Sequence, residues 1–583
     1  MFKQPIIHSY DPCFYEDYPG VYPTSKPYSA DAYQKVLLER INYEKEQKRL
    51  VVNSYRVHRA ISYPLPVVDF PALEYRGGGY DGYGYSIYLS WRLRERWDTL
   101  HAAVETYDDK TALTILTKEI RLLASWPQFS EQTQPDHLLP LGHYALCFAK
   151  FLRLRTCLQE DKEVIESGAR RLLNEFLMPA VTEKLSSTIT PDRAGLHNIL
   201  NIALIGAAAL ASVLGEGIAE TIWDKVYEVI TVLNAARLDA EKPFSEGPCY
   251  DSFFSVHLTA AAALAEQQER FLIFEPLFAS MVTDFITMSL PGRADFFAPH
   301  GDVEPQMQFP QICAMHYALW YPDKADNAIA YLSHIPPIRM LPDVLCFVAN
   351  SQINTTPLND PFLHVNPAAI AMRSGYNACD TLCGISFGRC MMGHLHYDAG
   401  SITISKNGRL YITDPGYQQY YNDNHERDFT VGLTAHNAPV IDGCVQTLRG
   451  AFMINYENNR VLLDISACYG YETGSVLREI DFGKTLVKVK DSFSGLKAAM
   501  IEYHFHLGTN TAASLCKTGT VSAHAEGEGL YIQGEMNGVL LPFSPVDMLR
   551  HPGSRGPNYI YQGVKLTNDK QFITWQFEFK EEA

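Results

Sequence analysis

The chain has 583 residues, which exceeds what one hydrophobic core usually organises, so two large domains are expected. Its 46% hydrophobic and 20% charged residues are typical of a globular protein and exclude a disordered one. The formal net charge of −17 argues against a general nucleic-acid binder or a protein that docks on anionic membranes. A few basic residues in one cleft could still bind an anionic polymer.

The first twenty residues, MFKQPIIHSYDPCFYEDYPG, lack a basic start followed by an apolar run, which is the pattern of a signal peptide. The twelve cysteines are scattered and form no CxxC pair, so most are expected to be reduced core residues. Both observations predict a cytoplasmic protein, or a secreted or periplasmic one if a leader was removed. The apolar stretch 202–214 falls short of the ~20 residues of a membrane span and predicts a buried helix.

Up to about residue 340 the periodicity is helical. Apolar residues recur at three- and four-residue spacings in 113–126, 143–159 and 219–238. The segments 194–214 and 251–268 are apolar nearly all round and rich in Ala and Gly, as expected of helices that pack closely on several sides. The pattern predicts a bundle or toroid of antiparallel helices.

From about residue 360 apolar and polar residues alternate, with Gly, Asn and Asp between the runs. This alternation predicts many antiparallel strands and a β-sandwich. The boundary is expected in the proline-rich, polar stretch 335–361. The chain is therefore predicted to be an α+β protein with a helical domain over 1–345 and a β-sandwich over 346–583.

One hairpin gathers metal-binding side chains. In MMGHLHYDAGSITISKNGRLYITDPGY (391–417), the Asn-Gly pair is a strong hairpin signal, so His396 and Asp414 should meet at the open end. His436 follows in TAHNAPVIDG beside another strand. Each residue alone could be an ordinary polar group at a strand end, but together they predict a zinc site. His394 points to the same side as His396, two residues away, and remains available for chemistry.

The helical half adds further candidates near helix starts. GLHNI contains His197 and Asn198, and SEGPCYDSFF contains Tyr250. A helix cap and a packed aromatic ring are the alternative explanations for these residues.

These stretches together resemble the heparinase II/III-like polysaccharide lyases over roughly residues 90 to 510. The most specific part is HLHYDAGSITISKNGRLYITDPGY with the later TAHNAPVIDG, and GLHNILNIALIGAAALAS, EGPCYDSFF, APHGD and LREIDFGKTLVKVKDSFSG agree with it. The resemblance implies an N-terminal (α/α) toroid, a C-terminal antiparallel β-sandwich and an active site between them. It also implies β-elimination on uronic-acid glycans such as heparan, chondroitin, hyaluronan or alginate.

Residue roles follow from the resemblance by motif. His396, Asp414 and His436 match the ligands of one divalent metal, usually Zn²⁺, which is expected to be mainly structural. His394 matches the catalytic histidine and Tyr250 the catalytic tyrosine. The pair His197 and Asn198 matches the region that neutralises the substrate carboxylate. Many relatives have Asn-His or Asn-Asn-Trp where this chain has His-Asn-Ile, so the neutralising residue of the pair stays open, with Asn198 favoured.

Elimination requires these kinds of side chain. Removing the C5 proton of a uronate places a second negative charge beside the carboxylate, which neutral donors can stabilise. A base must take that proton, and the C4 oxygen must receive one as it leaves. An imidazole and a phenol, with ordinary pKa values of ~6.5 and ~10, cover these tasks.

Substrate contacts are less visible in the sequence. Tyr417 could stack on a sugar ring, and Arg427 and Arg389 could hold a carboxylate or sulfate. Glu246, just before Tyr250, is also predicted to bind substrate. Loop packing and surface salt bridges are the alternatives for the tyrosine and the arginines.

Two other functions remain compatible with the residues. A uronate C5-epimerase would use the same proton chemistry without cleaving a bond. In a non-catalytic glycan-binding protein, the metal-binding hairpin would only stabilise the fold. A zinc hydrolase is disfavoured because the chain has no HExxH motif.

Overall fold

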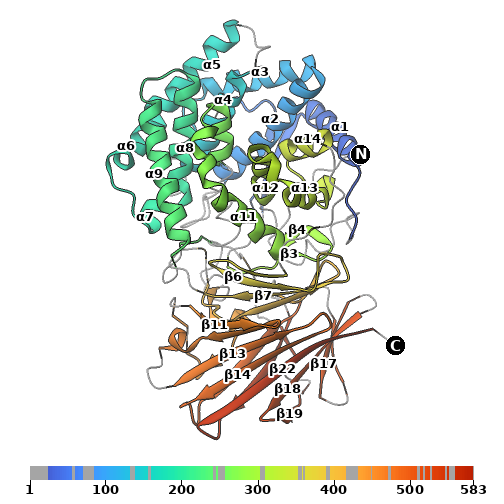
Figure 1. Cartoon of the computed structure of the whole chain (residues 1–583). Helices are drawn as coiled ribbons and strands as arrows, with labels where there is room; N and C mark the ends of the chain where they lie inside the picture. Colours follow the sequence, from blue (N-terminus) through green and yellow to red (C-terminus); the bar gives the residue numbers. More distant parts are fainter. Residues whose placement is uncertain are drawn as a thin grey trace.

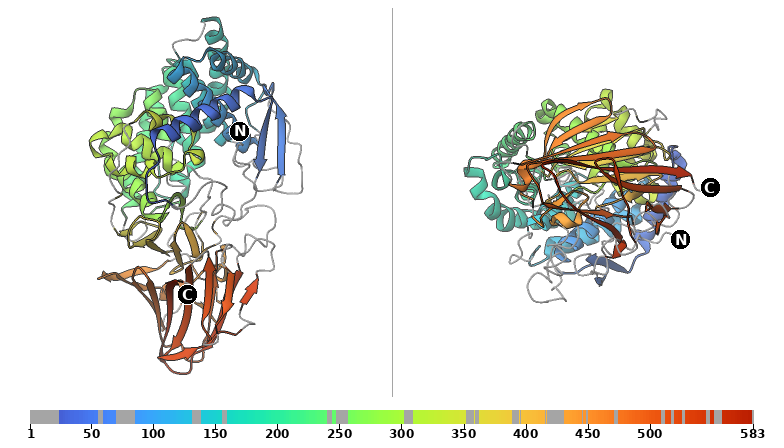
Figure 2. Two further views of the ribbon diagram at one scale, coloured as in Figure 1. Left: turned by 90° about the vertical axis from the view of Figure 1, so that its right-hand side faces the viewer. Right: turned by 90° about the horizontal axis from the view of Figure 1, so that it is seen from below.

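The structure is a computed structural model, and it describes residues 24–54, 59–69, 85–130, 138–154, 159–239, 244–246, 257–301, 309–351, 358, 362–388, 394, 396–414, 416, 431–444, 446–447, 450–470, 474–508, 512–516, 519–525, 528–544, 548–550 and 558–581. Helices occupy one end of the molecule and sheets the other (Figures 1 and 2). This order of elements along the chain confirms the predicted α+β class.

The helical half contains two β-hairpins besides its helices. Its α-helices are α1 Ala30–Glu46, α2 Tyr85–Tyr107, α3 Lys110–Ser125, α4 Leu138–Leu152, α5 Gln159–Arg171, α6 Met178–Ser186, α7 Arg193–Leu196, α8 Asn198–Val213, α9 Ala219–Arg237, α11 Glu275–Met288, α12 Phe309–Trp320, α13 Asp326–Ser333 and α14 Pro342–Asn350, and residues 257–264 are also helical. A π-helix spans Leu172–Leu177, and 3₁₀ turns span Gln268–Phe274, Pro322–Lys324 and Pro337–Arg339. The hairpins are β1 Arg49–Ser54 with β2 Arg59–Pro64, and β3 Ser289–Leu290 with β4 Arg293–Phe297.

Helices α4 and α8 pack at the centre of this half because glycines let them approach. A Cβ on Gly206 would lie 2.9 Å from the Cα of Gly142, and a Cβ on Gly142 would lie 2.7 Å from Ile202 Cγ2. The segments Ala194–Val213 and Gln268–Met288 are long and apolar enough to cross a membrane, yet 72% and 61% of them are buried inside the fold. The stretch 202–214 therefore lies in the core, as predicted.

The second half consists of strands. They are β5 Leu363–Val365, β6 Ala369–Arg373, β7 Thr381–Ser386, β8 Ile402–Lys406, β9 Arg409–Ile412, β10 Val440–Ile441, β11 Phe452–Glu457, β12 Arg460–Asp464, β13 Ser475–Phe482, β14 Leu486–Ser494, β15 Met500–His506, β16 Ala512–Leu515, β17 Val521–Ala525, β18 Glu528–Met536, β19 Val539–Leu541, β20 Met548–Arg550, β21 Asn558–Lys565 and β22 Lys570–Glu581. Leu433–Ala435 and Ser466–Tyr469 are 3₁₀ turns. Within the described ranges, strands β5 to β9 form one antiparallel sheet in chain order, and the later strands form a nine-stranded and a four-stranded sheet.

The β5–β9 sheet is a middle layer, buried on both faces (Figure 1). Ala369 and Ala371 belong to the hydrophobic core of the helical half, whereas the intervening Ile370 and Met372 belong to the core of the later sheets. Successive side chains of a strand point to opposite faces, so β6 contributes to both cores. The alanines of β6 face the helices, and its larger side chains face the sandwich.

Hydrogen bonds join the two halves across this layer. The Arg373 guanidinium on β6 donates to the carbonyls of Thr287 (2.7 Å) and Ser289 (2.6 Å) at the end of α11. His364 Nε2 lies 2.5 Å from Asp284 Oδ1. These contacts fix the sheet that carries the predicted hairpin over 402–412 against the helices.

The predicted hairpin over 402–412 is confirmed. Strand β8 pairs with β9, and Asn407 and Gly408 both have positive φ, 53° and 67°, as a tight Asn-Gly turn requires. The open end of this hairpin carries the residues that precede β8 and follow β9.

Two helical predictions need correction. The predicted helix over 194–214 is broken at His197, which caps α8 and has an extended backbone with ψ of 135°. The predicted helix over 143–159 ends as α4 at Leu152. Periodicity continues through such ends because apolar loop residues also pack on the core. In addition, α14 runs to Asn350, across the expected boundary at 345, and β5 begins at Leu363.

Low pH is expected to destabilise the helical half through His316. Burial, followed by the nearby Arg94 and Lys150, lowers the pKa of His316 to about 3. The unfolded state therefore takes up this proton first, near pH ~6.5, and the fold loses about 2 kcal/mol from this group by pH ~5. The free energy of unfolding of wild type and His316→Asn should be measured by denaturant at several values across this pH range. Its dependence on pH should correspond to about one proton fewer taken up on unfolding in the variant. Equal slopes would contradict the assignment.

Candidate active site and metal centre

His396, Asp414 and His436 meet at the open end of the hairpin. His396 precedes β8, Asp414 follows β9, and His436 follows the 3₁₀ turn Leu433–Ala435. Their possible ligand atoms all lie within 4.8 Å of one another, and the three side chains are at most 1% exposed. His436 Nδ1 lies 2.7 Å from Asp414 Oδ2, and the two imidazole centroids are 5.3 Å apart. We call these three residues the buried triad.

The electrostatics of the buried triad suit a cation. Burial opposes protonation of His436, but contact with Asp414 outweighs burial and raises the pKa of His436. Burial likewise opposes ionisation of Asp414, but His436 holds the pKa of this carboxyl below its ordinary value. His436 Nε2 is buried and has no hydrogen-bond partner among the described residues. Two imidazoles and one carboxylate with a buried, unused nitrogen fit a divalent metal such as Zn²⁺.

Asn437 secures the strands around the buried triad, a role that the sequence did not reveal. Its amide nitrogen donates to the carbonyls of Ile402 (2.8 Å) and Thr413 (2.6 Å), and its amide oxygen accepts from the His506 backbone (2.8 Å). This one side chain ties β8, the end of β9 and β15 together beside His436. The adjacency of His and Asn in TAHNAPV was the available signal.

Two further buried ionisable residues surround the buried triad. His300, from the APHGD segment, lies 3.2 Å from Thr403 Oγ1 in β8, and a Cβ on Gly384 would lie 2.4 Å from its Nε2. Burial lowers the pKa of His300 to about 4. Asp398 is fully buried, and burial raises its pKa although His436 and His396 act against that shift. Asp398, the last residue of the HLHYD motif, therefore belongs to the same buried group of ionisable residues.

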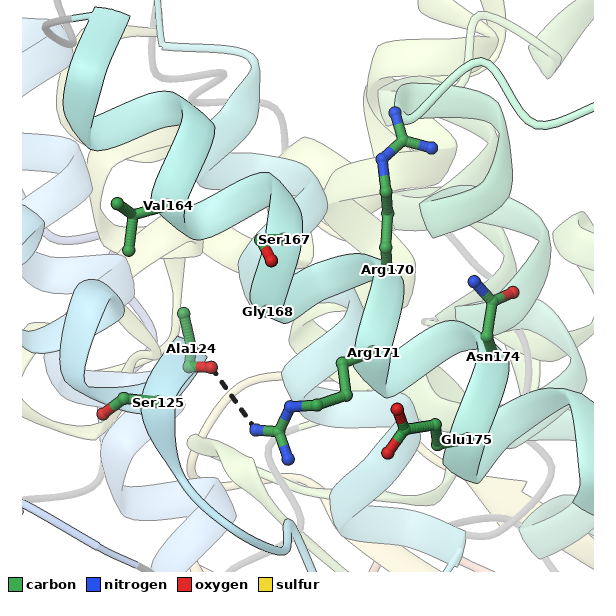
Figure 3. A pocket seen from close by; sticks show the side chains of 9 residues that line it. All are labelled: Ala124, Ser125, Val164, Ser167, Gly168, Arg170, Arg171, Asn174 and Glu175. Carbon is green, nitrogen blue, oxygen red and sulfur yellow. Dashed lines mark hydrogen bonds between the residues drawn. The ribbon is translucent and has the colours of Figure 1, made fainter.

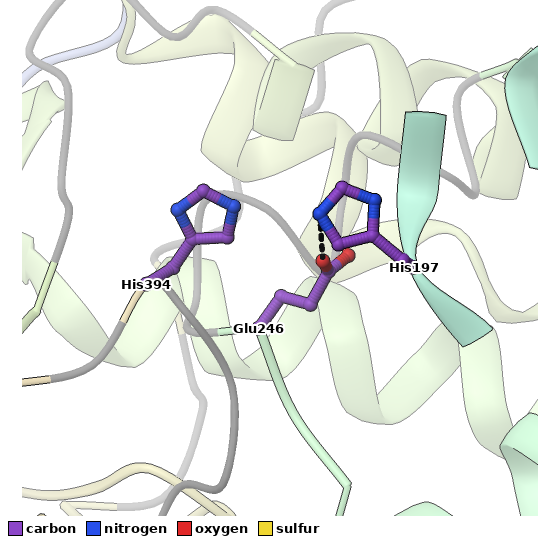
Figure 4. A group of neighbouring side chains, drawn as sticks. All are labelled: His197, Glu246 and His394. Atoms are coloured by element: carbon purple, nitrogen blue, oxygen red, sulfur yellow. Dashed lines mark ion pairs between the residues drawn. The ribbon is translucent and has the colours of Figure 1, made fainter. Parts of the chain in front are cut away.

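A second cluster, which we call the junction cluster, lies where the two halves meet (Figure 4). It consists of His197, Glu246 and His394, whose possible ligand atoms also lie within 4.8 Å of one another. The His197 and His394 rings are stacked with centroids 6.3 Å apart, and His197 Nε2 is 3.8 Å from Glu246 Oε1. Glu246 is only 3% exposed.

Asn198 and His197 both contact Glu246. The Asn198 amide donates to Glu246 Oε2 at 3.0 Å, and this bond is buried. His197 Nδ1 accepts from the Ile199 backbone N–H at 3.4 Å, as a helix cap. The structure thus brings His394 of the β half next to His197, Asn198 and Glu246 of the helical half.

Four predicted residues lie outside the described residues: Tyr250, Tyr417, Arg427 and Arg389. Their roles as the catalytic tyrosine and as substrate contacts therefore stay predictions.

A groove of about 530 Å³ lies elsewhere, between the end of α3 and the α5–π-helix segment (Figure 3). Both arginines that line this groove already contact other residues of the protein. Arg171 donates to the carbonyls of Ala124 and Trp126 and stacks on Phe129, and Arg170 pairs with Glu216. These contacts stabilise the fold, and the groove brings together none of the histidines described above.

Adding Zn²⁺ to metal-free protein is expected to raise its stability through the buried triad. Binding to the folded state alone contributes about 2.7 kcal/mol at a free zinc concentration of roughly 100 times Kd. Thermal melts with and without zinc should show the increase in wild type and a clearly smaller one in Asp414→Asn. An Asp481→Asn control, with a carboxylate on the surface, should behave as wild type. An unchanged zinc response in Asp414→Asn would contradict this site.

Comparisons with known proteins agree with the predicted resemblance. Residues 383–569 match the family model described as Heparinase II/III-like, C-terminal. No curated protein matches the sequence. A crystal structure of heparinase III is 14% identical with a TM-score of 0.63, covering 98% of this chain and 89% of that chain. A heparan sulfate lyase from Pedobacter heparinus is 14% identical with a TM-score of 0.52, covering 94% of this chain and 83% of that chain.

These comparisons confirm the resemblance and the fold class. At such identities the structural likeness shows the fold, a helical toroid followed by a β-sandwich. The family match ends inside the β half and includes the buried triad and His394.

Proposed function

We propose that the protein is a polysaccharide lyase, because residues 383–569 match the heparinase II/III-like C-terminal family model. Its substrate is a uronic-acid glycan, most closely a glycosaminoglycan such as a heparan-type chain, and its reaction is β-elimination. The heparinase III and heparan sulfate lyase structures with this fold support that substrate class.

The observation that carries the proposal is the junction cluster beside Asn198. Residues of both halves converge there, and they offer an imidazole base together with neutral donors. Neutral donors suit a uronate carboxylate because they stabilise the enolate that develops when C5 loses its proton. The His197 and His394 ring centroids are 6.3 Å apart, so one sugar residue could contact both imidazoles.

Asn198 is assigned as the carboxylate-neutralising residue, with His197 beside it. An amide nitrogen carries two protons, and Asn198 donates one of them to Glu246. The second amide proton can be donated to the substrate carboxylate. The Asn198–Glu246 bond sets the orientation of the amide that makes this donation. Since His197 Nδ1 accepts the cap bond, its proton resides on Nε2, where it is also a donor.

His394 and Tyr250 then transfer the protons. The base removes the C5 proton, the C4–oxygen bond breaks, a C4–C5 double bond forms, and the leaving oxygen receives a proton. Tyr250 serves as the acid, and as base too when the C5 proton and the leaving group lie on one face. His394 is the base for the other C5 epimer.

The buried triad would hold one divalent metal, best Zn²⁺. Bound there, the metal supplies positive charge that neutralises Asp414 and fixes the hairpin. His396, two residues from His394, then sets the position of the base. Elimination consumes no water, so the proposal gives the metal a structural role.

The experiment incubates the protein with heparan, chondroitin, hyaluronan and alginate separately and follows the ultraviolet absorbance of the 4,5-unsaturated uronate. We expect a rise with a glycosaminoglycan. A flat trace on every polymer with folded protein that carries one equivalent of zinc would refute the lyase. Proton exchange at C5 without absorbance would identify a C5-epimerase, and glycan binding without either reaction would identify a binding protein.

Tyr250→Phe is expected to lower kcat by about 10²–10⁴-fold, because phenylalanine has no hydroxyl proton to donate to the leaving oxygen. Turnover is measured on the polymer that gives the absorbance rise. Tyr456→Phe, on the exposed face of β11, serves as the matched control and should retain turnover. A folded Tyr250→Phe with near-normal turnover would remove Tyr250 from the mechanism.

A further inference from the structure

We propose that the junction cluster of His197, Glu246 and His394 is a second metal site, separate from the buried triad, which binds Zn²⁺ or a similar divalent ion and thereby inhibits the enzyme. The binding itself is independent of the proposed function. The inhibition rests on that function, because it assumes that His394 is the base.

The ligand set is the first argument. Two imidazoles and one carboxylate, with a position left for water, form the usual ligand set of an open zinc site. Zinc bonds of roughly 2.0–2.2 Å place neighbouring ligand atoms roughly 3.3–3.6 Å apart. The junction cluster already has its ligand atoms within 4.8 Å, with His197 Nε2 3.8 Å from Glu246 Oε1. Closing the site therefore requires side-chain shifts on the order of 1 Å.

The environment of Glu246 is the second argument. Its carboxylate is 3% exposed, and Asn198 holds Oε2, so Oε1 lies on the side of His197 (Figure 4). A buried carboxylate is stabilised by a cation, and a metal ion held by the two imidazoles would lie beside this carboxylate. His197 and His394 are accessible enough for an ion to enter, since both are only partly buried.

Metal binding has a defined cost at His197. Coordination through Nε2 moves the ring proton to Nδ1 and removes the cap bond from Ile199 N–H. That bond is long, 3.4 Å, and at the limit of a useful hydrogen bond, so little is lost. The Asn198–Glu246 bond is unaffected because it uses Oε2.

The consequence for the reaction follows from the lone pair of His394. A metal that takes the lone pair prevents this imidazole from accepting the C5 proton. The same metal also occupies the surface on which the uronate carboxylate would meet Asn198. Excess zinc should therefore inhibit, whereas zinc in the buried triad should not.

The test is a calorimetric zinc titration of protein already loaded at the buried triad, without substrate. We expect a second binding event in wild type, weakened at least about tenfold in Glu246→Gln and in His197→Ala. Glu266→Gln, an exposed surface carboxylate, is the matched control and should bind as wild type. Retention of the first zinc and of the melting temperature would show that each variant is folded.

The outcomes separate this inference from the proposed function. Absence of a second event, or an unchanged second event in both variants, overturns the second site whatever the activity. A second event lost in the variants supports the site even if no polymer is cleaved, in which case only the proposed function fails. If polymer is cleaved, activity should fall in step with occupation of the second site, and full activity at saturation would overturn the inhibitory role.

Discussion

Arg478→Ala is expected to lower the free energy of unfolding by about 3–5 kcal/mol, because it leaves a buried carboxylate without its cation. Arg478 and Asp491 are both fully buried and form a bidentate pair, with Nε–Oδ1 at 2.7 Å and Nη2–Oδ2 at 2.8 Å. Tyr503 also donates to Asp491 at 2.8 Å, but a neutral hydroxyl cannot replace the guanidinium. The variant therefore retains a desolvated charge in the core of the sandwich.

The same substitution should weaken metal binding. Arg478 Nη1 donates to the carbonyls of Gly400 (2.6 Å) and Asn437 (2.9 Å). Gly400 lies in the turn after the HLHYD motif, and Asn437 adjoins His436, so the guanidinium supports two of the segments that carry the buried triad. Loss of such an outer contact is expected to reduce zinc affinity by about 10–100-fold.

Urea unfolding and zinc titration of the same preparations provide the measurement. Arg460→Ala is the matched control, since the Arg460–Asp481 pair joins the neighbouring strands β12 and β13 but is 58% and 39% exposed. Exposed pairs contribute only about 0–1 kcal/mol, and zinc affinity should not change. If Arg478→Ala and Arg460→Ala lower the free energy of unfolding equally and only slightly, the Arg478–Asp491 pair does not stabilise the fold as proposed.

His394→Ala is expected to lower kcat by about 10²–10⁴-fold on substrates that need the imidazole base. The zinc of the buried triad and the melting temperature should stay near wild type, because His394 is only partly buried and lies outside the buried triad. A loss confined to kcat separates a chemical role from the structural role of His396.

Turnover and zinc content are measured on wild type, His394→Ala and His334→Ala. His334, at the end of α13, has a ring that hydrogen-bonds to Ala330 and Ser333 of the same helix, so its substitution should leave turnover intact. If His394→Ala keeps full kcat on every cleaved polymer, Tyr250 alone must transfer the protons. If His394→Ala also loses the zinc of the buried triad, His394 and His396 are not separable in function.

Much of the fold was predictable because periodicity reports which face of each element is buried. Helical spacing up to about 340 and alternation from about 360 predicted the two halves, and Asn407 with Gly408 predicted the β8–β9 hairpin. Periodicity could not predict the break at His197, since the apolar pattern continues on both sides of it. Nor could it predict that the β5–β9 sheet would be buried between two cores.

The candidate site was predicted in part for a related reason. His396 and Asp414 were found because one turn signal brings the ends of a hairpin together, and His436 was found beside the strand-like run that follows. Glu246 was expected to bind substrate, and the structure shows that it accepts a hydrogen bond from the Asn198 amide and faces His197. His300 was not assigned to the site, and it reaches the hairpin from a distant segment.

By itself, the sequence determined the two halves, the hairpin and the kinds of side chain available for elimination, because these depend on spacing along the chain. Only the tertiary structure decided which residues meet. The stacking of His197 on His394 joins segments almost two hundred positions apart, and the Arg478 contacts behind the buried triad join β13 to the segments at Gly400 and Asn437. Such contacts result from the packing of two cores against one sheet, and local periodicity carries no information about that packing.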